Sequence, residues 1–113
     1  MDDRLPAALE ARAIMRAVET AGGHAMLLQK GDRDRGALVL MLLEKDRHMA
    51  CYERELTMQG RYEWTRTGPD ENAGNQAINA FIERKKRGDP DLWILELTVA
   101  DAQGFADETL SRD

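Results

Sequence analysis

The chain begins with apolar side chains that recur at the period of an α-helix. Over residues 6–21 they lie three or four positions apart and fall on one face, while arginines and a glutamate occupy the other. Pro6 is tolerated in the first turn of a helix, and Gly22-Gly23 provides a stop. The pattern therefore predicts an amphipathic helix over residues 6–21.

The next part of the chain alternates between short apolar segments and polar turns, which is typical of strands. Strands are expected at about 24–30, 37–44 and 48–57, with a fourth that ends before Thr67-Gly68. The segment 37–44 is apolar on both faces. It predicts a central strand that is covered on both sides, or one that is covered by a helix on one side and by a second copy of the chain on the other.

The third and fourth strands are expected to form a hairpin with a three-residue loop, Met58-Gln59-Gly60. This loop places glycine at a left-handed position. It places Glu55 directly opposite Glu63, and this like-charge pair is mildly unfavourable. However, it gathers the aromatic and apolar side chains on one face of the hairpin. One face then carries the aromatic and apolar side chains together with two arginines: Tyr52, Leu56, Tyr62, Trp64, Arg54 and Arg66.

A second helix is expected after the hairpin, with Asp70 as its N-cap. Four basic residues, Arg84 to Arg87, close this helix at the end where the helix dipole favours cations. Pro90 prevents the helix from continuing. The last strand is expected at about residues 92–99.

The element order α-β-β-β-β-α-β, with short turns between consecutive strands, predicts an α+β fold. We expect a mainly antiparallel sheet of about five strands, with two helices packed on one face. Residues 1–105 form the single expected domain, and residues 106–113 are expected to be an acidic, frayed tail.

Composition and charge narrow the expected partners. The formal net charge is -5, and residues 89–113 hold seven acidic side chains against one basic one. An acidic chain of this kind disfavours nucleic-acid binding. The longest apolar run, from Ala37 to Leu43, is too short to cross a bilayer, and Cys51 is the only cysteine. We expect a cytoplasmic protein with no membrane partner and no intrachain disulfide.

The sequence shows no group of side chains that predicts catalysis, a cofactor or a metal. Ser111 is the only serine, and it has no nucleophile motif around it. Cys51 shares a strand face with acidic side chains, which favours an inert thiol. His48 and Cys51 are three positions apart in a predicted strand, so they are expected on opposite faces and unable to bind one metal ion together.

Two groups of residues are candidate binding sites. The arginines and aromatic rings of the hairpin form either a cation–π binding platform or a core beneath a helix, with the arginine heads reaching solvent. The turn Asp89-Pro90-Asp91 either shapes the chain through Asx-type hydrogen bonds or contacts a ligand. The candidate binding residues are Arg54, Trp64, Arg66, Asp89, Asp91 and Trp93.

This turn belongs to the most specific of several short motifs, Asp89-Pro90-Asp91-Leu92-Trp93. The others are Lys30-Gly31-Asp32, Gly36-Ala37-Leu38-Val39, Trp64-Thr65-Arg66 and Ala80-Phe81-Ile82-Glu83-Arg84. With these motifs the chain resembles, over about residues 4–105, a family of small bacterial proteins known only as a domain of unknown function, number fourteen ninety-one. The resemblance implies a small single-domain protein without an established catalytic residue.

We therefore expect a non-catalytic interaction or regulatory module. Its partner is a protein or a second copy of the chain, bound at the aromatic–arginine face, the acidic C-terminal segment or an exposed strand edge. The alternative is a small-ligand binder or a small enzyme that uses Arg54, Arg66 and Trp64 with a carboxylate such as Glu53 or Asp91. Nucleic-acid binding through the basic end of the second helix is the weakest hypothesis.

Overall fold

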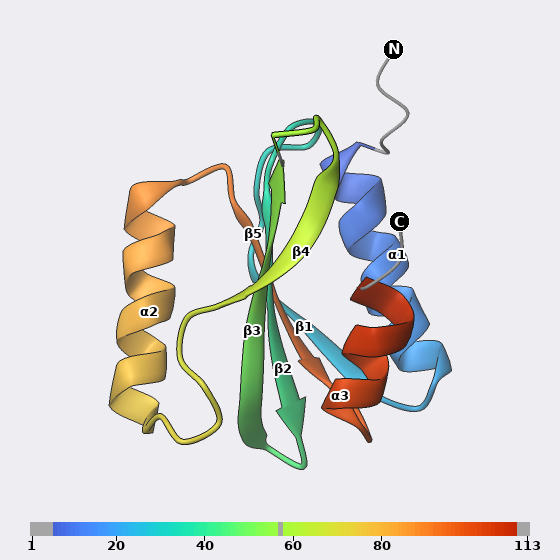
Figure 1. The fold of residues 1–113 in the computed structure, drawn as a ribbon, viewed down its shortest axis with the longest axis vertical. Helices are drawn as coiled ribbons and strands as arrows, with labels where there is room; N and C mark the ends of the chain where they lie inside the picture. Colours follow the sequence, from blue (N-terminus) through green and yellow to red (C-terminus); the bar gives the residue numbers. More distant parts are fainter. Residues whose placement is uncertain (1–5, 57, 111–113) are drawn as a thin grey trace.

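The computed structural model describes residues 6–56 and 58–110 and shows a sheet flanked by helices (Figure 1). In chain order the elements are α1 (Ala7–Thr20), β1 (His24–Gln29), β2 (Leu38–Glu44), β3 (Arg47–Leu56), β4 (Tyr62–Thr67), α2 (Asn75–Gly88), β5 (Trp93–Thr98), the short helix α3 (Ala102–Phe105) and the π-helical turn η1 (Ala106–Leu110). The first helix and the four strands with predicted bounds each begin and end within one residue of those bounds.

The five strands form one mixed sheet in the order β1-β5-β2-β3-β4. β5 lies between β1 and β2 and runs parallel to β2, whereas the other neighbouring pairs are antiparallel. The parallel pair arises because α2 carries the chain from the edge strand β4 back to the centre of the sheet (Figure 1). The predicted α+β class and the largely antiparallel sheet are confirmed, and β1 and β4 are the two edges.

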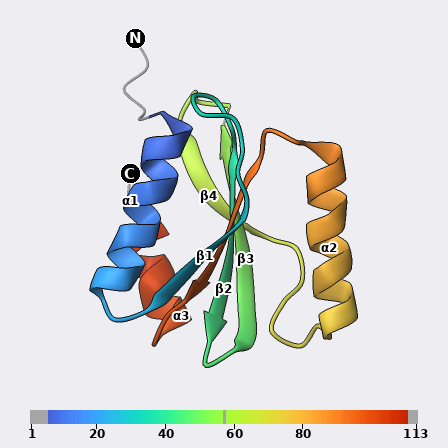
Figure 2. The ribbon, with the colours of Figure 1, turned by 180° about the vertical axis from the view of Figure 1, so that it is seen from behind.

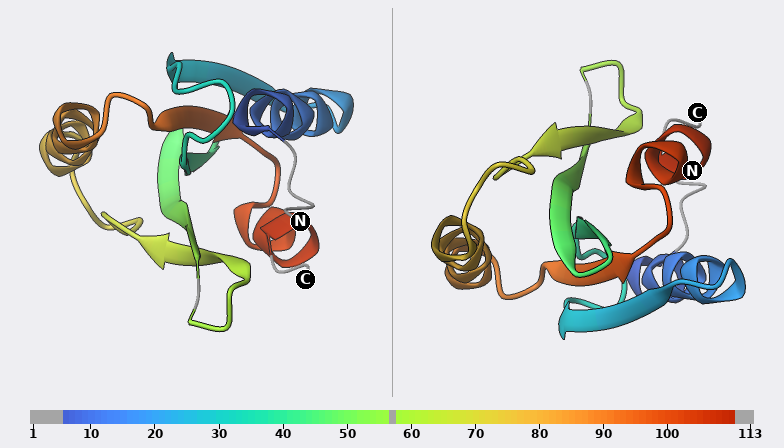
Figure 3. Two further views of the ribbon diagram at one scale, coloured as in Figure 1. Left: turned by 90° about the horizontal axis from the view of Figure 1, so that it is seen from above. Right: turned by 90° about the horizontal axis from the view of Figure 1, so that it is seen from below.

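The predicted packing of two helices on one face is wrong. α1, α3 and η1 lie on one side of the sheet, and α2 lies on the other (Figures 2 and 3). The cause is β2, in which the five consecutive residues Leu38 to Leu42 are all buried. Leu38, Leu40 and Leu42 pack on the α1 side, while Val39 and Met41 pack with Phe81 of α2. A strand that is apolar on both faces needs cover on both.

The hairpin between β3 and β4 has the predicted register. Glu55 pairs with Glu63, and the last pair before the turn joins Leu56 and Tyr62. Gly60 has a φ of 80°, which is the left-handed conformation that the three-residue loop requires. Thr57 lies outside the described residues. The register places Ala50, Tyr52 and Arg54 of β3 and Trp64 of β4 on the α1 side of the sheet.

The C-terminal segment is ordered as helix, where a frayed tail is predicted from residue 106. Ala102, Ala106 and Leu110 recur at a spacing of four, and all three are buried in the core on the α1 side. The Asp101 carboxylate accepts a hydrogen bond of 3.1 Å from the Gly104 N–H and caps this segment. The prediction of a frayed tail considered only the acidic composition of this segment and missed the apolar spacing. Residues 111–113 lie outside the described residues.

The start of α2 also differs from the prediction. Asp70 accepts a 2.9 Å hydrogen bond from the Asn72 N–H, which forms a local turn instead of a helix cap. The helix begins five residues later at Asn75, with Gly74 as its N-cap. Only Phe81 of this helix is buried, so α2 packs on the sheet through a narrow stripe.

Candidate functional site

The structure buries Arg54 of the arginine–aromatic cluster beneath α1 and leaves Tyr62 and Arg66 exposed. Arg54 is 9% exposed, and its guanidinium is ion-paired with Glu10 of α1. The same guanidinium lies 5.2 Å from the ring centre of Tyr62 and 5.9 Å from that of Trp64. The cluster thus fills the space between α1 and the hairpin, and the Arg54 head does not reach solvent.

The other groups of the predicted arginine–tryptophan–carboxylate site do not join this cluster. Arg66 is exposed, and its Nη2 lies 3.5 Å from the carbonyl oxygen of Met49. Glu53 is on the opposite side of the sheet, where it contacts Lys85 of α2 at 2.7 Å. The structure therefore brings Arg54 and Trp64 together and places the predicted carboxylate Glu53 on the opposite side of the sheet.

The Asp89–Trp93 turn is held by hydrogen bonds within the chain. The Asp89 carboxylate accepts a 3.0 Å bond from the Asp91 N–H. The Gln29 side-chain amide donates to the carbonyl oxygen of Leu92 at 2.7 Å. The indole of Trp93, a buried residue, donates to the carbonyl oxygen of Asp32. These contacts support the shaping role of the turn.

Two glycines of the loop after β1 enclose this turn. A Cβ added at Gly31 or at Gly36 would overlap the Asp91 carbonyl oxygen and come within 2.7 Å of Cδ1 of Trp93. Between the glycines, the Asp32 carboxylate accepts N–H groups of Arg35 and Asp34, which lowers the pKa of Asp32. The Lys30–Val39 motifs and the Asp89–Trp93 motif thus pack against each other.

The predicted separation of His48 and Cys51 is wrong. A β-bulge shifts the pairing of β2 and β3, so that Leu42 faces Ala50 and Leu43 faces His48. The extra residue turns His48 to the side of Cys51, and Nε2 of His48 lies 3.9 Å from Sγ of Cys51.

The environment of the Cys51 thiol keeps it protonated. The thiol is fully buried and lies 3.4 Å from Sδ of Met41. Burial raises the pKa of Cys51 to about 12. Within residues 6–56 and 58–110, no three side chains of the His, Cys, Asp or Glu type are placed to hold a metal ion together.

Large apolar side chains are exposed in the β3–β4 hairpin, at Met58 and Tyr62, and in the edge strand β1. Met26 is 47% exposed and Leu27 is 41% exposed, and β1 contains no charged residue. Leu27 lies on the α1 side because it pairs with Leu95, and Met26 lies on the α2 side because it pairs with Glu96. The other edge, β4, carries exposed charges that disfavour pairing with another chain.

The outer face of α1 extends this apolar character beside β1. Leu9 is half exposed, and together with Ala13 and Ala17 it lines a shallow hollow of about 730 Å³ that Arg12 and Arg16 border. α1 packs over β1 and β5 (Figure 2). We call Leu9, Ala13, Ala17, Met26 and Leu27 the apolar edge. Its helical part was missed in the sequence, although these residues recur every four positions beside the arginines.

No helix of the described residues has the length and apolar character needed to span a membrane. No curated protein matches the chain. Among solved structures, a crystal structure of a DUF1491 family protein from Caulobacter crescentus is 23% identical, with a TM-score of 0.78 over 90% of this chain and 94% of that chain. An NMR structure of a DUF1491 family protein from the same organism is 24% identical, with a TM-score of 0.73 over 86% and 87% of the two chains.

The solution structure of protein Atu0922 from A. tumefaciens is 27% identical, with a TM-score of 0.66 over 87% of this chain and 88% of that chain. The sequence profile of one family, described as a protein of unknown function, matches residues 5–107. This match agrees with the resemblance carried by the motifs that meet around Trp93. The chain belongs to the DUF1491 family.

Proposed function

We propose that this chain is a non-catalytic interaction module whose binding surface is the apolar edge. One observation carries the proposal: β1 is an edge strand without charged residues, and it exposes Met26 and Leu27. Proteins usually protect such an edge with charged residues, proline or a covering element, because it pairs readily with another strand. Here β4 has such charges and β1 has none.

The occupant that fits this edge is a second copy of the chain. Two β1 strands related by a two-fold axis run antiparallel, and this arrangement opposes no like charges because β1 is uncharged. It joins the two sheets and places both α1 helices on the same face of the joint sheet. Leu27 and the Leu9–Ala17 stripe then lie toward the partner copy, which accounts for their exposure.

A bulge limits how much of β1 can pair. The register with β5 shifts between Leu27 and Gln29, so the regular part of the strand is His24–Leu27. Four residues provide a short ladder, and the apolar edge of each copy has to supply the remaining contact. Substitutions in β1 and substitutions on the outer face of α1 should therefore each weaken the dimer.

The test is the mass of the protein in solution, measured by light scattering after gel filtration. The wild-type chain of 12.8 kDa should elute with twice that mass when it is loaded at about 1 mM. Leu27→Lys should elute as a monomer at the same concentration. Thr65→Lys on the other edge is the matched control and should remain dimeric. Circular dichroism checks that each variant is folded. A monomeric wild type, or a Leu27→Lys dimer, would overturn the proposal.

A further inference from the structure

Two sulfur atoms and an imidazole nitrogen meet on the α2 side of the sheet. Sγ of Cys51 lies 3.4 Å from Sδ of Met41 and 3.9 Å from Nε2 of His48. Met41 and Cys51 are paired residues of β2 and β3, and the β-bulge adds His48 to them. Bulges often redirect a side chain next to a functional site. The structure thus removes the reason for which His48 and Cys51 were not expected to bind one metal ion.

The separations of these atoms fit bonds to a single ion. Metal–sulfur bonds are about 2.3 Å long and metal–imidazole bonds about 2.0 Å. Two sulfurs on one ion therefore lie at most about 4.6 Å apart, and a sulfur and a nitrogen at most about 4.3 Å. Both observed distances, 3.4 Å and 3.9 Å, are shorter than these limits. An ion bonded to Cys51 can therefore reach Met41 as well as His48.

The His48 ring has a buried nitrogen without a partner. Its Nε2 lies 2.9 Å from the carbonyl oxygen of Pro69, whereas Nδ1 has no hydrogen-bond partner among the described residues. When the proton is on Nδ1, the lone pair of Nε2 and the Pro69 oxygen face each other beside Cys51. This tautomer binds metal ions, and a cation next to both atoms relieves their repulsion. Unpartnered buried polar atoms of this kind are expected where an ion binds.

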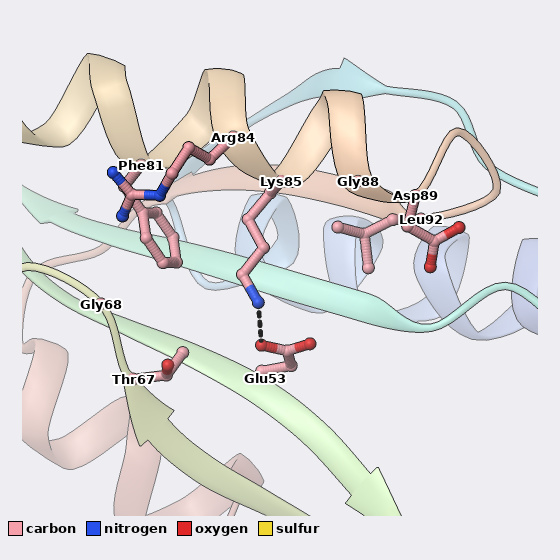
Figure 4. A pocket seen from close by; sticks show the side chains of 9 residues that line it. All are labelled: Glu53, Thr67, Gly68, Phe81, Arg84, Lys85, Gly88, Asp89 and Leu92. Atoms are coloured by element: carbon pink, nitrogen blue, oxygen red, sulfur yellow. Dashed lines mark hydrogen bonds and ion pairs between the residues drawn. The ribbon is translucent and has the colours of Figure 1, made fainter.

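The segment that carries the Pro69 carbonyl is fixed by α2. Gly68 has a φ of 67°, and a Cβ added there would come within 2.7 Å of the Phe81 ring (Figure 4). Glycine is therefore required at this position by the backbone conformation and by the contact with Phe81. His48 and Pro69 are partly exposed, whereas Cys51 is buried. An ion can thus enter beside His48 and reach the sulfur atoms behind it.

The ligand atoms and their burial select a soft ion with a single charge. Thiolate, thioether and imidazole together suit copper(I), whereas structural zinc takes four ligands from cysteine, histidine and carboxylates. Copper(I) bound to one thiolate leaves the site neutral. Zinc(II) bound to the same thiolate would leave a positive charge in apolar surroundings, which is costly. The core around Met41 and Cys51 is of this apolar kind, with Val39, Phe81 and Ile94 in the same cluster.

We propose that Met41, His48 and Cys51 bind one copper(I) ion. The S–H bond of Cys51 breaks, its proton leaves to solvent, and a copper–thiolate bond forms with no change in oxidation state. Met41 and His48 each donate a lone pair to the ion. The proton of the His48 ring is then on Nδ1, and the Pro69 carbonyl oxygen no longer accepts it. The site shares no residue with the apolar edge, so it is a property separate from the proposed self-association.

The test is an anaerobic titration of the full chain with copper(I) in competition with the coloured chelator bicinchoninate. The wild type should take up one ion per chain, and Cys51→Ala should take up none. Met41→Leu should weaken binding at least about tenfold. Met49→Leu is the matched control, because Met49 packs on the opposite side of the sheet, and its affinity should equal that of the wild type. Both leucine variants conserve volume, and circular dichroism checks that they are folded.

Three results would overturn this proposal. The first is a folded wild type that leaves all the copper(I) with the chelator. The second is a Met49→Leu variant that loses as much affinity as Met41→Leu does. The third is zinc(II) binding as tight as copper(I) binding, which would contradict the choice of a soft monovalent ion. Leu27→Lys should bind copper(I) like the wild type, so the titration tests this site independently of the dimer.

Discussion

The indole Nε1 of Trp93 donates a hydrogen bond of 2.7 Å to the backbone carbonyl oxygen of Asp32. In return, the Asp32 N–H donates to the carbonyl oxygen of Asp91 at 2.9 Å. The loop after β1 and the turn before β5 are therefore joined in both directions. Buried polar groups that are paired in this way keep a turn in one conformation, because each unpaired group would cost free energy.

Gly36→Ala should destabilise the protein by more than about 2 kcal/mol, because the added methyl group overlaps the Asp91 backbone and Trp93. Neither the buried indole nor the backbone carbonyl can move away easily. The measurement is the free energy of unfolding in urea. Gly88→Ala is the matched control, since nothing lies near its added Cβ, and it should be neutral or slightly stabilising. Equal effects of the two substitutions would contradict this account of the loop.

Arg54→Ala should lower the free energy of unfolding by about 3 kcal/mol, because it leaves the Glu10 carboxylate without its partner under α1. Arg47→Ala is the control. Its ion pair with Glu71 is 4.0 Å long and largely exposed, and pairs of this kind contribute about 0–1 kcal/mol. Urea denaturation of both variants provides the comparison. A loss of less than about 1 kcal/mol for Arg54→Ala would mean that solvent reaches the Glu10 carboxylate in the folded state.

Local patterns predict the elements of this fold well. The helix over 7–20, the strands and the register that opposes Glu55 and Glu63 all follow from periodicity and turn residues. Such features depend on neighbours along the chain. The prediction of two helices on one face was wrong, because the apolar pattern of β2 is satisfied by a helix or by a second copy of the chain on its other face.

Features that depend on distant partners could not be predicted. The bulge that brings His48 to Cys51 comes from the pairing of β3 with β2, and strict alternation along β3 excludes it. Glu10 pairs with Arg54 across more than forty residues, and nothing in either local sequence indicates the partner. The contact between Glu53 of β3 and Lys85 of α2 depends on how this helix packs on the sheet, and the two residues are 32 positions apart.

Stability should fall at alkaline pH because of Cys51. Its pKa is about 12 in the folded protein, raised by burial from the ordinary value of 9.0. Above pH 9 the unfolded thiol loses its proton while the folded thiol keeps it, so the unfolded state is favoured as pH rises towards 12. The slope approaches about 1.4 kcal/mol per pH unit.

The check compares the pH dependence of urea unfolding in the wild type and in Cys51→Ala. The alanine variant should be less stable at neutral pH, because it leaves a cavity, but its stability should decline less steeply above pH 9. The difference between the two curves removes the titration of lysines and tyrosines, which both proteins share. Parallel curves would show that the thiol ionises equally in both states.

Removal of residues 106–113 should destabilise the protein by several kcal/mol, although the acidic composition of this segment suggests a dispensable tail. The truncation removes Ala106 and Leu110, which are 3% and 5% exposed in the core beside α1. Loss of one buried leucine side chain alone costs about 2–5 kcal/mol. The measurement is the thermal midpoint by circular dichroism, which should fall by ten degrees or more, at about 4–8 °C per kcal/mol.

Two variants separate the buried side chains from the charge of the segment. Leu110→Ala keeps every acidic residue and should reproduce about half of the loss or more. Asp107→Asn with Glu108→Gln removes two acidic charges from exposed positions and should leave the midpoint within about 2 °C of the wild type. A truncated chain with the same thermal midpoint as the full-length protein would show that Leu110 does not stabilise the core. If the charge variant melts lower than Leu110→Ala, the segment acts through its electrostatic field and not through packing.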